Sequence, residues 1–352
     1  FEIVEAEKVD SLSWAQMGVY QFIWGRYTWE NESTATIELR LNDMMSMDLL
    51  LGQSYKVTSK NIRKSLHDYT DQVIYQFFGQ KGSSSTKIAF VTKLGSSKEL
   101  AIMDYDGANK IKITSHNNIV NLPAWGHENL DLYYTWFKNG FPEIVVQNLK
   151  SGKVQTVLPK PKHTFGPKVS PNGKDLLFTM QKGGGSDIYK INLSNKRITR
   201  LSYHWAIETS PDWSPNGYEI VYSSNKSGRP QLYKMDKEGS NVERIIFNGK
   251  YVESASWSPD GNKIAYCIMD EGLLNIYIKD LGTQEVKKMT NQQGNNESPS
   301  WSPDGTMLAF SSNRSGSSQI YIMSVDGLRT EQLTFTGKNT SPAWSNYYSK
   351  TP

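Results

Sequence analysis

The sequence predicts a mainly β fold: a six-bladed β-propeller closed by a C-terminal strand and preceded by a small α/β domain. Three observations carry this prediction. A tryptophan followed by a tight turn, as in Trp301-Ser-Pro-Asp-Gly305, recurs at a fixed period. Short strand-like runs follow each copy, and the first and last copies of the repeat are each incomplete.

Each repeat begins with the tryptophan and its turn. Trp213, Trp257 and Trp301 are 44 residues apart, and each precedes Ser-Pro-Asn-Gly or Ser-Pro-Asp-Gly. In these turns proline presets φ, Asn or Asp can bond the nearby backbone, and glycine relieves the steric limit at the end. Trp125 and Val169 continue the series toward the N-terminus, and Trp344 ends it. Four short strands per repeat of this length are typical of a propeller blade.

The number of blades follows from the two ends of the series. Lys87–Val91 resembles the second strand of a blade, but no Ser-Pro-x-Trp strand precedes it. Residues 341–345 form a first strand with no blade after it. Pairing the two segments completes a sixth blade and removes two exposed sheet edges. We therefore expect the C-terminal strand to close the ring.

Residues 1–80 lack the repeat and predict the small α/β domain, with the propeller over residues 81–352. A polar, glycine-containing linker is expected over residues 80–85. A short helix is expected over Asp10–Met17, and a longer one with Ser59 as its N-terminal cap and Gly79 at its end. Strands are expected over residues 18–29, 34–41 and 53–58, and the apolar stripe of the longer helix is Ile62, Leu66, Tyr69, Val73, Ile74 and Phe77.

Composition argues against several classes of protein. The net charge is only +4 and no long basic run occurs, so we expect no nucleic-acid partner. No stretch of about 18 apolar residues exists, so we expect no membrane-spanning helix. The first residues lack the features of a signal peptide, which predicts a processed or trimmed chain. The single cysteine, Cys267, cannot form an internal disulfide and is expected to be a buried apolar residue.

The sequence also lacks the motifs of common enzymes. It contains no Gly-x-Ser-x-Gly elbow and no phosphate-binding glycine loop, and its five histidines show no metal-ligand spacing. We therefore expect no catalytic residues, no metal and no cofactor. A propeller hydrolase or lyase and a secreted sensor propeller remain alternatives, because propellers of this kind also occur in those classes.

Binding is the function that the loops favour. In a propeller, the loops from the fourth strand of one blade to the first strand of the next surround one mouth of the central channel. Here these loops mix apolar, aromatic, amide and acidic residues, which suits a protein or peptide ligand, although ordinary solvated loops are the other interpretation. Lys226 is expected at the opposite mouth. The candidate partner-binding residues in the loops are His163, Phe165, Glu208, Thr209, Glu253, Glu297 and Thr340.

Over nearly all of its length the chain resembles the TolB family, the periplasmic propellers of the Tol–Pal system. The most specific part of the resemblance is the helix Asn61-Ile-Arg-Lys-Ser-Leu-His-Asp-Tyr-Thr-Asp-Gln-Val-Ile-Tyr75. It is followed by Phe78-Gly-Gln-Lys-Gly82 and Thr86-Lys-Ile-Ala-Phe-Val91, which are similar to family motifs. Residues 225–234 also resemble a family stretch closely.

The resemblance implies a monomeric periplasmic protein that is not an enzyme and that supports outer-membrane integrity and cell division. It implies binding of the peptidoglycan-associated lipoprotein through the propeller mouth, and of TolA through the N-terminal part. Family members use a flexible N-terminal segment for TolA, and by the resemblance we expect this segment to be absent or removed here, which leaves TolA binding by this chain open. By the same resemblance, His163 and Gly166 match a family loop at the lipoprotein interface, and Thr209 matches a second contact.

Overall fold

The computed structural model describes residues 18–159, 163–291 and 293–347. The chain divides into two compact units, Phe1–Ser85 and Thr86–Pro352. The short helix expected over Asp10–Met17 lies outside the described residues.

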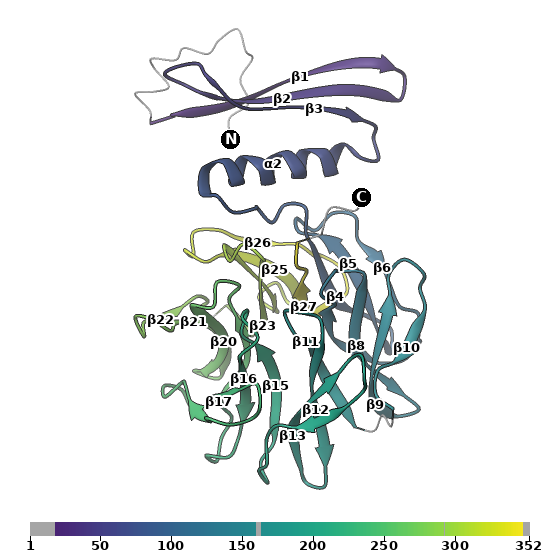
Figure 1. Ribbon diagram of the computed structural model, residues 1–352, viewed down its shortest axis with the longest axis vertical. Helices are drawn as coiled ribbons and strands as arrows, with labels where there is room; N and C mark the ends of the chain where they lie inside the picture. Colours follow the sequence, from purple (N-terminus) through teal and green to yellow (C-terminus); the bar gives the residue numbers. More distant parts are fainter. Residues whose placement is uncertain (1–17, 160–162, 292, 348–352) are drawn as a thin grey trace. The chain divides into compact units, whose positions relative to one another are not determined.

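Over its described residues, 18–85, the N-terminal unit is a three-stranded antiparallel sheet with one helix on it (Figure 1). The sheet order is β1-β2-β3, and the three predicted strands are confirmed with shifted ends. Two side-chain hydrogen bonds join the helix to the last strand of the sheet. Gln53 Nε2 donates to Gln72 Oε1 at 2.9 Å, and Tyr55 Oη donates to Asp68 Oδ2 at 3.2 Å. The elements are β1 (Gln21–Asn31), β2 (Thr34–Asp43), β3 (Leu49–Val57) and α2 (Ile62–Phe78).

The end of α2 is as predicted, but its start is not. Gly79 has φ +66° and its N–H donates to the Tyr75 carbonyl, a left-handed cap that glycine adopts at little cost. The prediction of Ser59 as the N-terminal cap is wrong, because the helix starts at Ile62 and Asn61 occupies the cap position. Asn61 makes no side-chain cap bond, since its Oδ1 accepts the Thr58 N–H at 2.6 Å instead.

The segment expected as a polar linker is tied back to α2 at its end. Asp71 is 2% exposed, and its carboxylate accepts the Ser84 and Ser85 N–H groups at 2.7 and 2.9 Å. Burial of this carboxylate raises the pKa of Asp71, and the hydrogen bonds act against that rise. The end of the segment is therefore ordered within its own unit.

The second unit is a propeller of six four-stranded sheets (Figure 1). Within a blade, each strand is antiparallel to the next. In the first blade β27 lies beside β4, with Thr340 opposite Val91 and Trp344 opposite Ile88. The predicted closure by a C-terminal strand is confirmed. The blade formed across the chain ends comprises β27 (Lys338–Trp344), β4 (Lys87–Leu94), β5 (Ser97–Asp104) and β6 (Ile111–Lys112).

The other five blades are continuous in sequence. They consist of β7 (Val120–Trp125), β8 (Asp131–Lys138), β9 (Phe141–Asn148) and β10 (Val154–Thr156); β11 (Thr164–Val169), β12 (Asp175–Lys182), β13 (Gly185–Asn192) and β14 (Ile198–Arg200); β15 (Glu208–Trp213), β16 (Glu219–Ser224), β17 (Gln231–Asp236) and β18 (Glu243–Arg244); β19 (Val252–Trp257), β20 (Lys263–Asp270), β21 (Leu273–Asp280) and β22 (Val286–Lys288); β23 (Asn296–Trp301), β24 (Met307–Ser312), β25 (Gln319–Ser324) and β26 (Thr330–Gln332).

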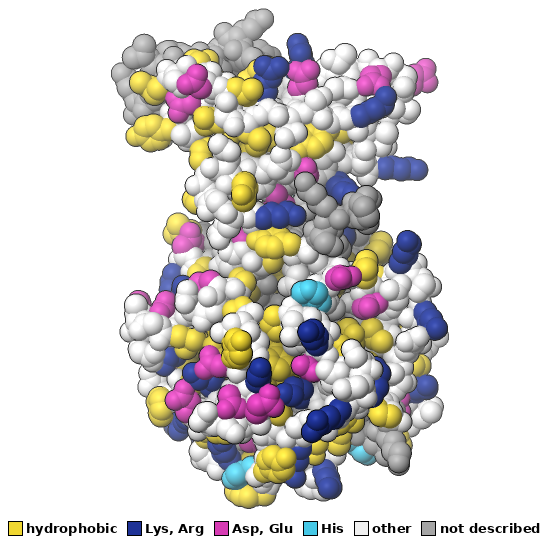
Figure 2. All heavy atoms as spheres, in the orientation of Figure 1, with side chains coloured by type: hydrophobic (Ala, Val, Ile, Leu, Met, Phe, Trp, Pro, Cys, Tyr) yellow, Lys and Arg dark blue, Asp and Glu magenta, His cyan; other side chains and the backbone are white. Residues whose placement is uncertain are grey.

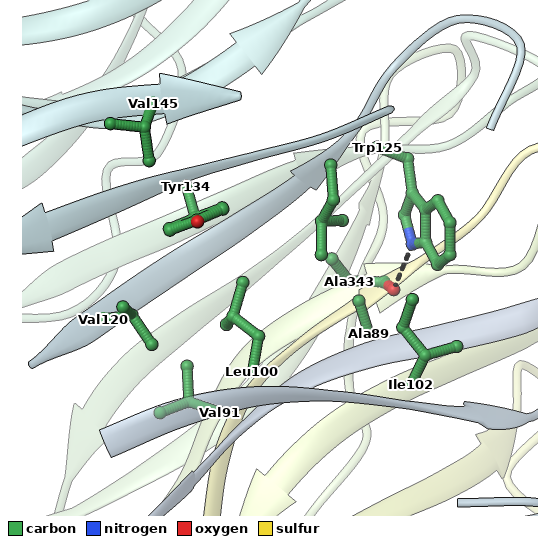
Figure 3. Packing of buried hydrophobic residues seen from close by; sticks show 10 residues of the cluster. Ala89, Val91, Leu100, Ile102, Val120, Trp125, Tyr134, Val145 and Ala343 are labelled. Carbon is green, nitrogen blue, oxygen red and sulfur yellow. Dashed lines mark hydrogen bonds between the residues drawn. The ribbon is translucent and has the colours of Figure 1, made fainter. Parts of the chain in front are cut away.

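The hydrophobic core lies between neighbouring blades. One cluster joins Val91 and Leu100 of the first blade to Trp125 and Tyr134 of the second (Figure 3). Trp125 Nε1 donates to the Ala343 carbonyl at 2.9 Å, so the indole also bonds across the blade boundary. Equivalent bonds run from Trp213 Nε1 to the Lys168 carbonyl at 3.2 Å and from Trp301 Nε1 to the Ser256 carbonyl at 3.0 Å.

Candidate functional site

Each first strand carries a β-bulge at the same place. In every blade two residues of the first strand lie opposite one residue of the second, as between Thr209 and Asp212. The first residue of each bulge has a positive φ of 52–66°. A bulge bends its strand and re-aims the neighbouring side chains. Only one of the six bulge residues is glycine; they are Leu122, Gly166, Ser210, Ser254, Ser298 and Ser341.

The residue just before each bulge is half-buried, whereas the residue before that is at most 1% exposed. Successive side chains of a strand point to opposite faces, which explains the difference. The first strands contact one another in a closed circle around the channel. The six half-buried residues therefore border one mouth. We name them the mouth ring: Asn121, Phe165, Thr209, Glu253, Glu297 and Thr340.

Five of these six residues were among the candidates from the sequence. Asn121 was missed, although it lies four residues before Trp125, the offset that Thr209 has from Trp213. Gly166 lies in a bulge, where its N–H donates to Thr135 Oγ1 at 3.1 Å. His163 lies just before β11, half-buried, with its ring 5.1 Å from the ring of Phe141.

Two expectations about this mouth are wrong. Glu208 is only 1% exposed, because strand alternation turns it away from the mouth, and its Oε1 accepts the Ser224 hydroxyl at 3.1 Å. Glu208 therefore cannot contact a partner at the rim. Lys226 lies on the same side as the mouth ring, because the second strand of a blade runs back toward that mouth. Asn225 beside it donates its N–H to the Ile207 carbonyl at 3.3 Å.

The mouth ring has an acidic side formed by Glu253 and Glu297 on neighbouring blades. Burial, and then the charge of Glu253, raise the pKa of Glu297, while Lys338 acts in the opposite direction. Tyr251 Oη donates to Glu253 Oε2 at 2.8 Å. Burial and this hydrogen bond raise the pKa of Tyr251 to about 12. Two adjacent carboxylates create a negative potential that a basic group of a partner would complement.

Exposed apolar side chains surround the same mouth, and the sequence interpretation missed them as a set. Tyr203, Phe247 and Phe335 are 72–74% exposed and follow the buried ends of three fourth strands. The signal in the sequence was their spacing, since Tyr203 and Phe247 are one 44-residue repeat apart. Trp205 is 76% exposed in the same loop as Tyr203.

The opposite mouth is a funnel of about 680 Å³. It is lined by tryptophans and Ser-Pro turns that follow the first strands. Lys168 Nζ lies 3.4 Å from Asp212 Oδ1, and Asp212 Oδ2 accepts the Trp257 N–H at 2.9 Å. Lys168 and Asp212 therefore pair with each other between adjacent blades of the ring.

Several features of the described residues bear on other kinds of site. Among the described residues, no group of three or more His, Cys, Asp or Glu side chains is arranged to hold a metal ion. The helix in the described part of the chain is too short or too polar to cross a membrane. On the face that Figure 2 shows, Lys and Arg side chains lie among Asp and Glu side chains. Cys267 is fully buried, and burial strongly raises the pKa of its thiol.

Comparisons with known proteins agree with this architecture. The TolB beta propeller domain family matches residues 75–272 and 252–350. The Tol-Pal system protein TolB of Hamiltonella defensa is 32% identical over 155 residues, which are 43% of this chain and 36% of that protein. The match thus spans about a third of that curated relative.

Solved structures extend the likeness to the whole fold. The crystal structure of TolB from Acinetobacter baumannii has a TM-score of 0.87 at 27% identity, over 97% of this chain and 86% of that one. Hydrazine synthase of Kuenenia stuttgartiensis has a TM-score of 0.61 at 12% identity, over 74% of this chain and 46% of that one, which shows the fold alone. With its closed six-bladed ring and with most of its length matched by the family, this chain belongs to the TolB β-propeller domain family.

Proposed function

We propose that this protein is a periplasmic, non-enzymatic binding scaffold of the Tol–Pal cell-envelope system. In this proposal it binds the peptidoglycan-associated lipoprotein at the mouth ring and supports outer-membrane integrity and cell division. Membership of the TolB propeller family supports the assignment to this system.

The observation that carries the proposal is the mouth ring. It places an amide, an aromatic ring, two hydroxyls and two carboxylates at one register position of six separate blades. Each side chain is half-buried, so its backbone and rotamer are restrained before a partner arrives. Mixed apolar and polar groups on a rigid frame are what a specific protein interface needs, because little ordering entropy is then lost on binding.

The test is titration calorimetry with the lipid-free domain of the lipoprotein. Thr209→Ala, His163→Ala and Glu297→Gln should each weaken binding, by about 1–4 kcal/mol where the residue is a hot spot. Glu128→Gln is the matched control for Glu297→Gln. Glu128 is an exposed carboxylate at the opposite funnel, so this variant removes the same charge from the other mouth.

The two mouths give opposite outcomes. If the lipoprotein docks on the mouth ring, Glu128→Gln binds like the wild type. Loss of affinity in Glu128→Gln, with none in Thr209→Ala, Glu297→Gln and His163→Ala, would place the partner on the opposite mouth and contradict this proposal. Absence of binding by the wild-type chain would reject the lipoprotein as its partner.

A further inference from the structure

The loop between β14 and β15 exposes three large apolar side chains within five residues. Tyr203 is 73% exposed, Trp205 is 76% exposed and Ile207 is 51% exposed. We name residues 203–207 the aromatic loop. Isolated exposed apolar residues are ordinary on protein surfaces, whereas a contiguous group of them marks an interaction surface.

Polar contacts hold the start of the aromatic loop in place. Arg200 Nη2 lies 2.8 Å from Asp187 Oδ2, and Asp187 is itself only 4% exposed. Arg200 Nε donates to the Ser202 carbonyl at 2.9 Å, and its guanidinium lies 4.6 Å from the centre of the Tyr203 ring. Tyr203 Oη in turn donates to the Arg200 carbonyl at 3.1 Å. The exposed tyrosine ring is therefore fixed by a buried acid through one arginine.

The end of the aromatic loop is anchored as well. Ala206 is 1% exposed, and its carbonyl accepts the Ser186 N–H at 3.2 Å. The N–H of Ile207 donates to Asn225 Oδ1 at 2.8 Å. Trp205 lies between these anchors, with its ring 5.1 Å from the ring of His204. Aromatic side chains that are exposed but already ordered lose little entropy when a partner covers them.

From this geometry we propose that the aromatic loop is the apolar anchor of the interface at the mouth ring. The occupant is a protein partner that packs apolar side chains on Tyr203 and Trp205 and directs a basic side chain toward Glu253 and Glu297. The inference rests on the proposed function and adds to it which part of the rim supplies most of the affinity. Tryptophan and tyrosine are the residues most enriched among interface hot spots.

Continuity and charge favour this occupant. The aromatic loop runs directly into β15, so that Ile207 is two residues from Thr209 of the mouth ring. One partner surface can therefore cover both. The carboxylates of Glu253 and Glu297 repel an anionic lipid surface and attract a basic protein group. A protein with an apolar and basic tip matches both features.

The experiment measures binding of the lipid-free lipoprotein domain to the full chain by titration calorimetry. We expect Trp205→Ala and Tyr203→Ala each to weaken binding roughly tenfold or more. Tyr218→Ala is the matched control. Tyr218 is 63% exposed beside the opposite mouth, and Lys237 Nζ lies 4.9 Å from its ring centre, much as Arg200 lies over Tyr203. The control should bind like the wild type.

The outcomes separate this inference from the function on which it rests. If the wild type binds and Glu297→Gln weakens binding while Trp205→Ala and Tyr203→Ala do not, the function stands and the aromatic anchor is rejected. If the wild type does not bind the lipoprotein, both are rejected. A second experiment mixes the chain with vesicles that contain anionic lipid but no lipoprotein. Sedimentation of the wild type, but not of Trp205→Ala, with these vesicles would make the loop a lipid contact and overturn the proposal.

Discussion

The side chain of Asn129 forms a two-way clamp with the backbone of Asn346. Asn129 Nδ2 donates to the Asn346 carbonyl at 2.9 Å, and Asn129 Oδ1 accepts the Asn346 N–H at 3.1 Å. Nδ2 also donates to the Tyr347 carbonyl at 3.0 Å. Asn129 lies in the β7–β8 turn of the second blade, so the segment after β27 is bonded to that blade as well as to its own. The ring is thus closed by these hydrogen bonds to the second blade as well as by the β27–β4 ladder.

Removing the clamp should weaken the ring measurably. Asn129 is 2% exposed and has φ +56°, a conformation that asparagine tolerates better than alanine. We expect Asn129→Ala to cost about 2–3 kcal/mol of unfolding free energy, from the unsatisfied backbone groups and the strained φ.

Deleting residues 339–352 removes β27 itself and should abolish cooperative unfolding. Urea denaturation followed by tryptophan fluorescence checks both; a truncated chain that melts like the intact one would contradict the closure argument.

The repeated tryptophans should act as structural residues. Trp301 is 7% exposed and bonds the Ser256 carbonyl of the preceding blade. Trp301→Ala leaves a cavity and removes a hydrogen bond between two blades, and we expect it to cost about 3–5 kcal/mol. Trp205→Ala is the control, because its side chain is 76% exposed and should leave thermal stability nearly unchanged. Equal melting temperatures for Trp301→Ala and the wild type would refute the structural role.

The pH dependence of stability should carry a signature of Glu297. Its pKa is raised in the folded chain, first by burial and then by Glu253, from an ordinary value of 4.5. The folded state therefore binds this proton more tightly than the unfolded state does. The stabilisation from this group is complete below pH 4.5 and is lost as the pH rises through the raised folded pKa.

Glu297→Gln removes this titration. We expect the free energy of unfolding of the variant, minus that of the wild type, to be larger at pH 7 than at pH 4. Chemical denaturation of both proteins across this range measures the change. Parallel stability curves for Glu297→Gln and the wild type would mean that the pKa of Glu297 is not raised in the folded chain.

The sequence could predict the blades because their signals are local. The period of Trp213, Trp257 and Trp301 and the turn after each one fix strand, turn and strand without knowledge of distant contacts. The orphan strands at the two ends then fix the closure. The same period could have identified Asn121, because only its offset from Trp125 was needed.

The candidate site was less predictable, because side-chain direction depends on single-residue register. Glu208 and Thr209 are neighbours in sequence, yet one is buried in the blade and the other borders the mouth. The bulge that follows was not visible either, since serine or leucine occupies it in five blades and neither residue type signals a positive φ. The contacts of Asp187 and Arg200 that fix the aromatic loop are likewise set only by tertiary packing.

The bulges themselves give the last prediction. Leu122 is 38% exposed and has φ +52°, so its backbone is strained while part of its side chain lies in solvent. Glycine adopts this conformation without the steric cost of about 1–2 kcal/mol, and this relief offsets the lost burial and the added freedom of the unfolded chain. Leu122→Gly should therefore change stability by less than about 0.5 kcal/mol. Leu130→Gly is the matched control: Leu130 is 50% exposed and is not among the positive-φ residues. There the added backbone freedom of the unfolded chain should lower stability by about 0.5–1 kcal/mol. Thermal and urea unfolding should thus show a clearly smaller loss of stability for Leu122→Gly than for Leu130→Gly, whereas equal destabilisation would show that the positive φ of Leu122 stores no strain.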